Sequence, residues 1–100
     1  MRCYWDEEDI WFYLEVDDED WVIRQVELEG PERTPIAAAS LAEWRRAQET
    51  GRLATYESSF GITAERPVSE WEDHDPEPLT CDEFEQVWNT ARRRIADRPS

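Results

Sequence analysis

The chain has 100 residues, a length typical of one domain, and carries 25 acidic against 11 basic side chains for a net charge of -14. Because phosphate contacts need clustered positive charge, this balance argues against nucleic-acid binding. No apolar run approaches the roughly 20 residues that span a bilayer, and the first residues lack the apolar stretch of a signal peptide. We therefore expect a single acidic domain over residues 1–100, located in the cytoplasm, with no membrane or nucleic-acid partner.

Aromatic side chains must supply much of the core. Leu, Ile, Val and Phe together number only 18, which with so large a net charge is typical of disordered chains. Six Trp and three Tyr offset this shortage, because each buried aromatic side chain removes about 150–250 Å² from water. The two cysteines, Cys3 and Cys81, are expected to be reduced thiols in or near the core.

The first 29 residues predict strands. Cys3 and Trp5 fit a short first strand, and the acids of 6–9 fit a solvated turn. Apolar side chains alternate strictly over residues 10–16, which predicts a strand with Trp11, Tyr13 and Glu15 on the face opposite the other apolar side chains. Residues 17–20 predict a hairpin loop, and residues 21–29 a further strand with a bulge near Arg24 or Gln25.

The middle of the chain predicts one short helix. Residues 36–39 fit either a strand or the approach to a helix, and Pro35 favours a sheet edge if they form a strand. Ser40 and Glu43 have the spacing of a capping box, which predicts a helix over 41–49 that stops at Gly51. Residues 52–60 are expected to form a strand that Gly61 ends.

The end of the chain predicts an amphipathic helix over about 81–96, opened by a capping box from Thr80 to Glu83. An irregular segment over 65–79, which Trp71 pins to the domain, precedes it, and a frayed tail over 97–100 follows. The expected fold is therefore α+β: an antiparallel sheet of three to five strands with N-terminal hairpins. The C-terminal helix packs on one face, and a shorter helix lies near 41–49.

Residues suited to catalysis are scarce, so we expect a protein without catalytic residues, metal or cofactor. His74, the only histidine, lies in a very acidic stretch, where a solvated side chain is expected rather than a general acid or a metal ligand. Three glycines cannot supply a phosphate-binding loop. Asp17 to Asp20 offer oxygen ligands for calcium, but the spaced acids and central glycine of an EF-hand loop are missing.

Negative charge is concentrated in two blocks: -9 over residues 1–29 and -8 over 65–85, whereas 30–64 are neutral and 86–100 carry +3. If the second block folds over the hairpins, the two form one acidic face that steers a basic protein. Exposed Trp11, Tyr13 and Trp71 are candidate anchors within this face. In the alternative, the acids only keep the protein soluble and the aromatic side chains all lie in the core.

Two stretches resemble a family of small, acidic, single-domain bacterial proteins of unknown function. One is Leu14-Glu15-Val16-Asp17 followed by Trp21, Arg24, Val26 and Glu27, and the other is Asp82-Glu83-Phe84-Glu85-Gln86-Val87-Trp88. The resemblance implies a strand-rich front half and a helical end, and it implies no activity. Small acidic bacterial domains of this kind include immunity proteins, which block toxic nucleases by mimicking charge. They serve here only as an analogy for the kind of partner.

These observations favour a non-catalytic, immunity- or inhibitor-like module that docks a basic protein. Its candidate binding residues are Trp11, Tyr13, Asp17, Asp18, Asp20, Trp21, Arg24, Glu27, Trp71, Asp73 and Asp75. The alternative is a small ligand-binding domain or enzyme with a cleft between the sheet and the C-terminal helix. This cleft is lined by Trp11, Tyr13, Trp21 and Trp88, with Arg24 and Glu27 as its polar groups. A third hypothesis is self-association of a monomer into a weak homodimer through aromatic strands.

Overall fold

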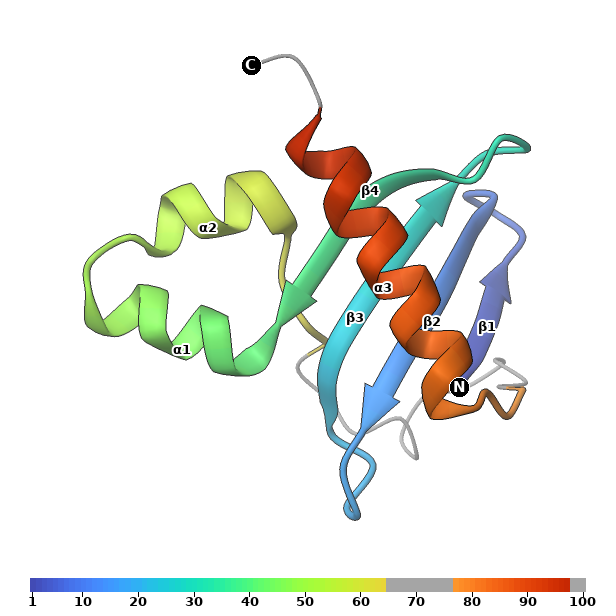
Figure 1. Ribbon diagram of the computed structural model, residues 1–100, viewed down its shortest axis with the longest axis horizontal. Coiled ribbons are helices and arrows are strands. Elements are labelled where there is room, and N and C mark those ends of the chain that lie inside the picture. The colour runs from blue at the N-terminus through green and yellow to red at the C-terminus, as the bar shows by residue number, and fades with distance from the viewer. Residues whose placement is uncertain (65–76, 98–100) are drawn as a thin grey trace.

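The computed structural model describes residues 1–64 and 77–97, which form an α+β fold with a four-stranded antiparallel sheet in the order β1-β2-β3-β4 (Figure 1). The elements are β1 (Arg2–Trp5), β2 (Ile10–Val16), β3 (Val22–Glu29), β4 (Thr34–Ser40), α1 (Leu41–Glu49), α2 (Leu53–Phe60) and α3 (Cys81–Ala96). The predicted fold class, the N-terminal hairpins and the helices over 41–49 and 81–96 are confirmed.

One bulge in the sheet decides which face each β3 side chain occupies. Glu15 pairs with Arg24 and Val16 with Val22, so Ile23 has no partner on β2. The bulge therefore lies just before the predicted positions. Residues 36–39, which fit either a strand or the approach to a helix, belong to the strand β4 on the other side of β3. β4 lies at the sheet edge, the position that Pro35 favours because it has no N–H.

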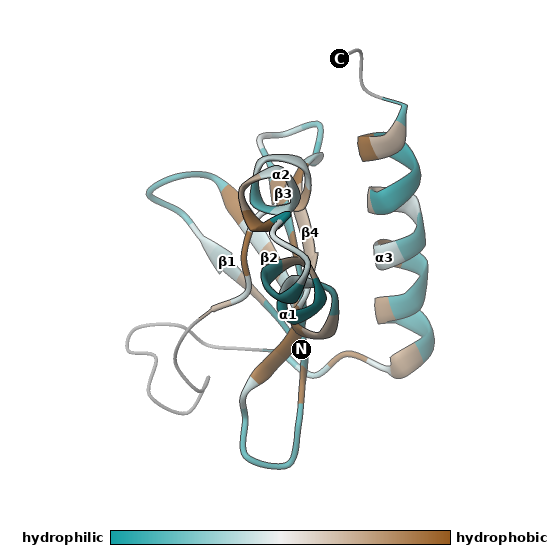
Figure 2. Ribbon diagram, turned by 90° about the vertical axis from the view of Figure 1, so that its left-hand side faces the viewer, coloured by the Kyte–Doolittle hydropathy of each residue, from teal (hydrophilic) through white to brown (hydrophobic). Residues whose placement is uncertain are grey.

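The sheet is apolar on both faces. α3 forms a separate layer over one face (Figure 2), where its side chains Phe84, Ala91 and Ile95 pack on Tyr13 and Val26 of the sheet. On the opposite face, Cys3, Leu14 and Val22 form a second cluster with Ala64 beside it. The stripe of apolar side chains that predicts the α3 helix is thus the surface that covers the main core.

Local capping signals fix the starts of α1 and α3. Thr80 and Glu83 exchange both hydrogen bonds of a capping box, as predicted. At α1, the Ser40 side chain accepts from the Glu43 N–H, but the Glu43 carboxylate contacts other helices instead of the Ser40 N–H. Gly51, at φ 72°, follows the end of α1 as expected.

The prediction of a strand over 52–60 is wrong, because residues 53–60 form the helix α2. Leu53, Tyr56 and Phe60 follow each other at intervals of three and four, so they share one side of a helix. α2 packs antiparallel to α1 beside the edge strand β4 (Figure 1). It ends at Gly61, as predicted, where φ is 86°.

The remaining predictions concern the thiols and the two segments 65–76 and 98–100. Both thiols are free, and Cys3 is buried as expected, whereas Cys81 is exposed. The predicted irregular segment, including Trp71 and His74, lies mainly outside the described residues, and so does most of the predicted tail. In the described ranges, no helix is long and apolar enough to cross a membrane.

Candidate functional site

The acidic loop between β2 and β3, residues 17–20, is shaped by the carboxylate of Asp17. Its Oδ1 accepts hydrogen bonds from the backbone N–H groups of Glu19 (2.9 Å) and Trp21 (3.0 Å). Asp20 adopts the left-handed region at φ 65°, which Asp tolerates better than most residues. The loop is therefore fixed by its own first acid, and the side chains of Asp18 and Glu19 are exposed.

Trp21 follows this loop and forms one wall of a groove of about 250 Å³. Trp21 is 39% exposed, and Ile62, which also lines the groove, is 46% exposed. The indole Nε1 of Trp44 donates to Glu57 (2.9 Å), which fixes the ring of a further wall. We call the loop 17–20 together with this groove the Trp21 surface.

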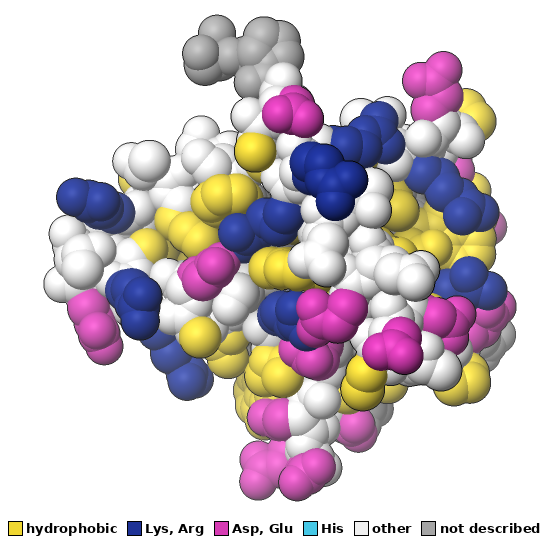
Figure 3. Space-filling view, in the orientation of Figure 1, with side chains coloured by type: hydrophobic (Ala, Val, Ile, Leu, Met, Phe, Trp, Pro, Cys, Tyr) yellow, Lys and Arg dark blue, Asp and Glu magenta, His cyan; other side chains and the backbone are white. Residues whose placement is uncertain are grey.

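Acidic side chains gather at the loop end of the molecule. In Figure 3, Asp and Glu lie mainly over the lower half of the view, around the loop and the start of α3, where Asp82 and Glu83 occupy the first turn. The acids of the turn 6–9 are at the other end of the sheet, because the seven residues of β2 separate them from the loop by roughly 20 Å. The turn 6–9 and the loop 17–20 therefore do not belong to one acidic face, and most of the second acidic block lies outside the described residues.

The acids of the loop do not converge on a common point. In the part of the chain that the structure describes, no group of three or more His, Cys, Asp or Glu side chains is placed to hold a metal ion. The Asp17 carboxylate is already engaged with backbone N–H groups. The chemistry of this surface is therefore that of exposed charges beside apolar side chains.

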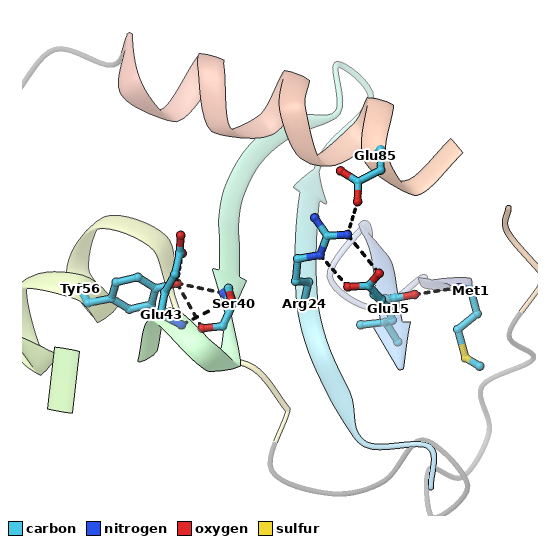
Figure 4. A network of polar contacts seen from close by, with 8 residues as sticks. Met1, Glu15, Arg24, Ser40, Glu43, Tyr56 and Glu85 are labelled. Carbon is cyan, nitrogen blue, oxygen red and sulfur yellow. Dashed lines mark hydrogen bonds and ion pairs between the residues drawn. The ribbon is translucent and has the colours of Figure 1, made fainter. Parts of the chain in front are cut away.

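Arg24 connects the sheet to α3. Its Nε and Nη2 donate to the Glu15 carboxylate at 2.6 and 3.0 Å, and Nη2 also pairs with Glu85 (Figure 4). The guanidinium lies over the rings of Phe84 and Trp88, 4.9 and 5.1 Å from their centroids. The bond from Arg24 holds the pKa of Glu85 below its usual range. Through Nε and Nη2, Arg24 therefore joins β2 and β3 to α3.

Glu27 lies on the opposite face of the sheet from Arg24. Its neighbours Val26 and Leu28 both face α3, so alternation directs Glu27 the other way, beside Gln25. Burial raises the pKa of the Glu27 carboxyl. Because they lie on opposite faces, Arg24 and Glu27 do not line one cleft between the sheet and α3, although a hollow of about 360 Å³ does lie beside Arg24.

Two of the candidate aromatic anchors are covered. Tyr13 is only 5% exposed and belongs to the main core under α3, so its prediction as an exposed anchor is wrong. Trp11 is half-buried, 4.9 Å from the ring of Tyr4, with two guanidinium groups over its face. Trp71, Asp73 and Asp75 lie outside the described residues. Of the candidate set, the structure brings together Asp17, Asp18, Asp20 and Trp21.

Arg92 is a connecting residue that the sequence does not single out, since there it only adds to the positive charge of residues 86–100. Its Nε donates to the Ala38 carbonyl (2.8 Å), its Nη2 pairs with Glu43, and its guanidinium lies between the rings of Phe60 and Trp88. Arg92 therefore joins α3 to α1, α2 and β4. No local pattern in the sequence indicates this role.

Tyr56 completes the same network. Its hydroxyl donates to Glu43 (2.8 Å) and accepts from the Ser40 N–H (2.9 Å), as Figure 4 shows. Burial raises the pKa of this hydroxyl. The helical spacing of Leu53, Tyr56 and Phe60 is the signal that could have located it.

Comparisons with family models, curated proteins and solved structures found no match to this chain.

Proposed function

We propose that this protein is a non-catalytic module of the cytoplasm that docks a basic protein through the Trp21 surface. The observation that carries the proposal is an exposed Trp beside an apolar groove, directly after four consecutive acids. Trp is among the residues that most often dominate binding energy at interfaces. The combination of an apolar anchor and a charged rim matches the composition of a protein-binding surface.

The two parts of the surface have different roles in this proposal. Trp21 and Ile62 supply apolar area whose burial holds the complex together, and therefore determine the dissociation rate. Asp18 and Glu19 are exposed, so they attract a basic partner and raise the association rate in a salt-dependent way. Because Asp17 already fixes the loop, docking requires little further ordering of the backbone.

An immunity- or inhibitor-like role is the form of this function that the charge favours. A basic surface that normally meets an anionic substrate is complementary to the loop end of this molecule, and occupying it would block the substrate. The proposed partner is thus a protein with a basic binding face, encoded in the same cell.

The experiment is cross-linking and affinity capture from the source cells at low salt, with three variants compared with the natural chain. Trp21→Ala removes the anchor, and Asp18→Asn with Glu19→Gln removes two charges at the rim. Trp5→Ala is the matched control, because Trp5 is similarly exposed (36%) but lies in β1, at the end of the sheet where the turn 6–9 lies.

We expect one basic protein to be captured by the natural chain and by Trp5→Ala, and to be lost with Trp21→Ala. With the partner purified, the variant Asp18→Asn/Glu19→Gln should bind it more slowly at low salt. Its dissociation rate should stay close to that of the natural chain. Recovery of no basic protein, or equal capture by the Trp5 and Trp21 variants, would remove the proposal.

A further inference from the structure

A second hollow, of about 600 Å³, lies between α1, α2 and α3, and we call it the helical cleft. Its lining includes Arg46, Ala47, Arg52, Tyr56, Phe60 and Arg92. In Figure 3, apolar side chains are visible in the region between the α1–α2 pair and α3. Its volume is within the range of sites that hold small molecules, about 300–1,000 Å³.

The part of the cleft around Tyr56 and Phe60 is aromatic, and the charged and hydroxyl groups of Arg92 and Tyr56 there are already paired. The rings of Tyr56 and Phe60 lie 5.1 Å apart, and Ala47 beside them is buried. Arg92 is neutralised by Glu43, and the Tyr56 hydroxyl donates to the same carboxylate. A ligand in this part of the cleft therefore meets aromatic and aliphatic surface and no unpaired charge.

The outer part of the cleft is positively charged. Arg46 and Arg52 lie on either side of the turn between α1 and α2. Backbone hydrogen bonds hold this turn closed, such as the one from the Arg52 N–H to the Ala47 carbonyl (2.8 Å). Both side chains are exposed, and within the described ranges neither has an ion-pair partner. Two guanidinium groups are thus free to meet an anion at the edge of an apolar hollow.

This charge contrasts with the rest of the molecule. Residues 41–60 and 91–96 carry six arginines against three acids, in a chain whose net charge is -14. Figure 3 shows the same separation, with arginine mainly over the helices and acids mainly over the loop end. Three of these six arginines, Arg46, Arg52 and Arg92, line the helical cleft, which favours an anionic ligand there.

We propose that the helical cleft binds a small organic anion with a flat apolar body. The body packs against Phe60 and Ala47, and the carboxylate, sulfonate or phosphate group faces Arg46 and Arg52, whose planar guanidinium groups suit such oxygens. Both parts are required, because exposed arginines alone bind an anion weakly in salt, and the body adds the burial of apolar area. This site is separate from the Trp21 surface.

The test uses two fluorescent probes that share an apolar body and differ in charge. 8-Anilinonaphthalene-1-sulfonate is the anionic probe, and N-phenyl-1-naphthylamine is its neutral counterpart. Each is titrated into the natural chain, into the double variant Arg46→Gln/Arg52→Gln, and into the control Arg45→Gln/Arg93→Gln. The control removes the same charge, and neither of its side chains lines the helical cleft.

We expect saturable one-to-one binding of the anionic probe, weakened at least about tenfold in the Arg46/Arg52 variant, since a charge-assisted hydrogen bond contributes about an order of magnitude in affinity. The control should bind as the natural chain does, and the neutral probe should respond equally to all three proteins. NMR shift changes should centre on Ala47 and Phe60. Equal weakening in both double variants, unsaturable binding, or shifts centred on the Trp21 surface would overturn the proposal.

Discussion

Replacing Arg92 with Met tests whether one side chain holds the helices against the sheet edge. Met retains much of the apolar stem of Arg92 but removes the guanidinium, which donates to Ala38, pairs with Glu43 and lies between two aromatic rings. Because these contacts connect α3 with α1, α2 and β4, the substitution should lower the free energy of unfolding of the whole domain.

The magnitude follows from the individual contacts. A hydrogen bond from a charged group contributes about 1.5–3 kcal/mol, and the Ala38 backbone that accepts it is fully buried. The two ring contacts, 3.9 and 4.5 Å from the guanidinium carbon to the centroids, add about 0.5–1 kcal/mol each. The pair with Glu43, whose side chain is 47% exposed, adds between 0 and about 1 kcal/mol. Since such terms are not additive, we expect a total loss of about 2–4 kcal/mol.

Urea unfolding followed by tryptophan fluorescence measures this loss, with Arg94→Met as the control. Arg94 also lies on α3 and is exposed, so its replacement should change stability by less than about 0.5 kcal/mol. A difference of less than about 1 kcal/mol between the two variants would refute the assignment of Arg92 as the connecting residue. The two variants are compared at equal dependence of the unfolding free energy on urea concentration, since a changed slope indicates a change in the folded or unfolded state.

Two further predictions concern the backbone and a buried acid. Gly61→Ala should lower the free energy of unfolding, measured by thermal unfolding, by about 2–4 kcal/mol more than Gly51→Ala does. Both positions have positive φ, but of the two only Gly61 is so placed that an added Cβ meets another atom, Ala37 Cβ at 2.9 Å. Equal losses of stability in the two variants would contradict the close contact of Gly61 with β4. Burial raises the pKa of Glu27 in the folded state, so its ionisation costs stability as pH rises through that value. Glu27→Gln should therefore be more stable than the natural chain at pH 7, by an amount that disappears as the pH falls below the ordinary carboxyl pKa, and a difference independent of pH would contradict this.

Elements with local signals could be predicted from the sequence, and those that depend on distant contacts could not. The period-two alternation of 10–16 and the two N-cap signals involve residues at most a few positions apart. In α2, by contrast, Tyr56 is held by Ser40 and Glu43, and Phe60 packs under Arg92. Tertiary contacts therefore outweigh the moderate strand preference of residues 52–60.

The candidate site was predictable only in part, because both faces of β2 are apolar. Tyr13 and Leu14 are equally suited to a core, and burial of Tyr13 was decided by α3, which covers that face. Arg24 and Glu27 are three residues apart, which places them on opposite faces of a regular strand. A bulge at Arg24 or Gln25 would have brought them to one face, but the bulge lies at Ile23, outside the pair.

The sheet edges favour recognition through side chains over the addition of a strand. At β4, Arg92 donates to the Ala38 carbonyl, and the Ser40 N–H donates to the Tyr56 hydroxyl, so these two outward-facing backbone groups of the edge are occupied. At β1, Arg2 exchanges two backbone hydrogen bonds with Glu77, at 2.9 and 2.7 Å. A second copy could extend the sheet at these positions only after breaking these contacts, and it would also bring two strongly acidic molecules together. The docking that we propose at the Trp21 surface requires neither step, because its apolar groove and its exposed acids face solvent in the folded protein.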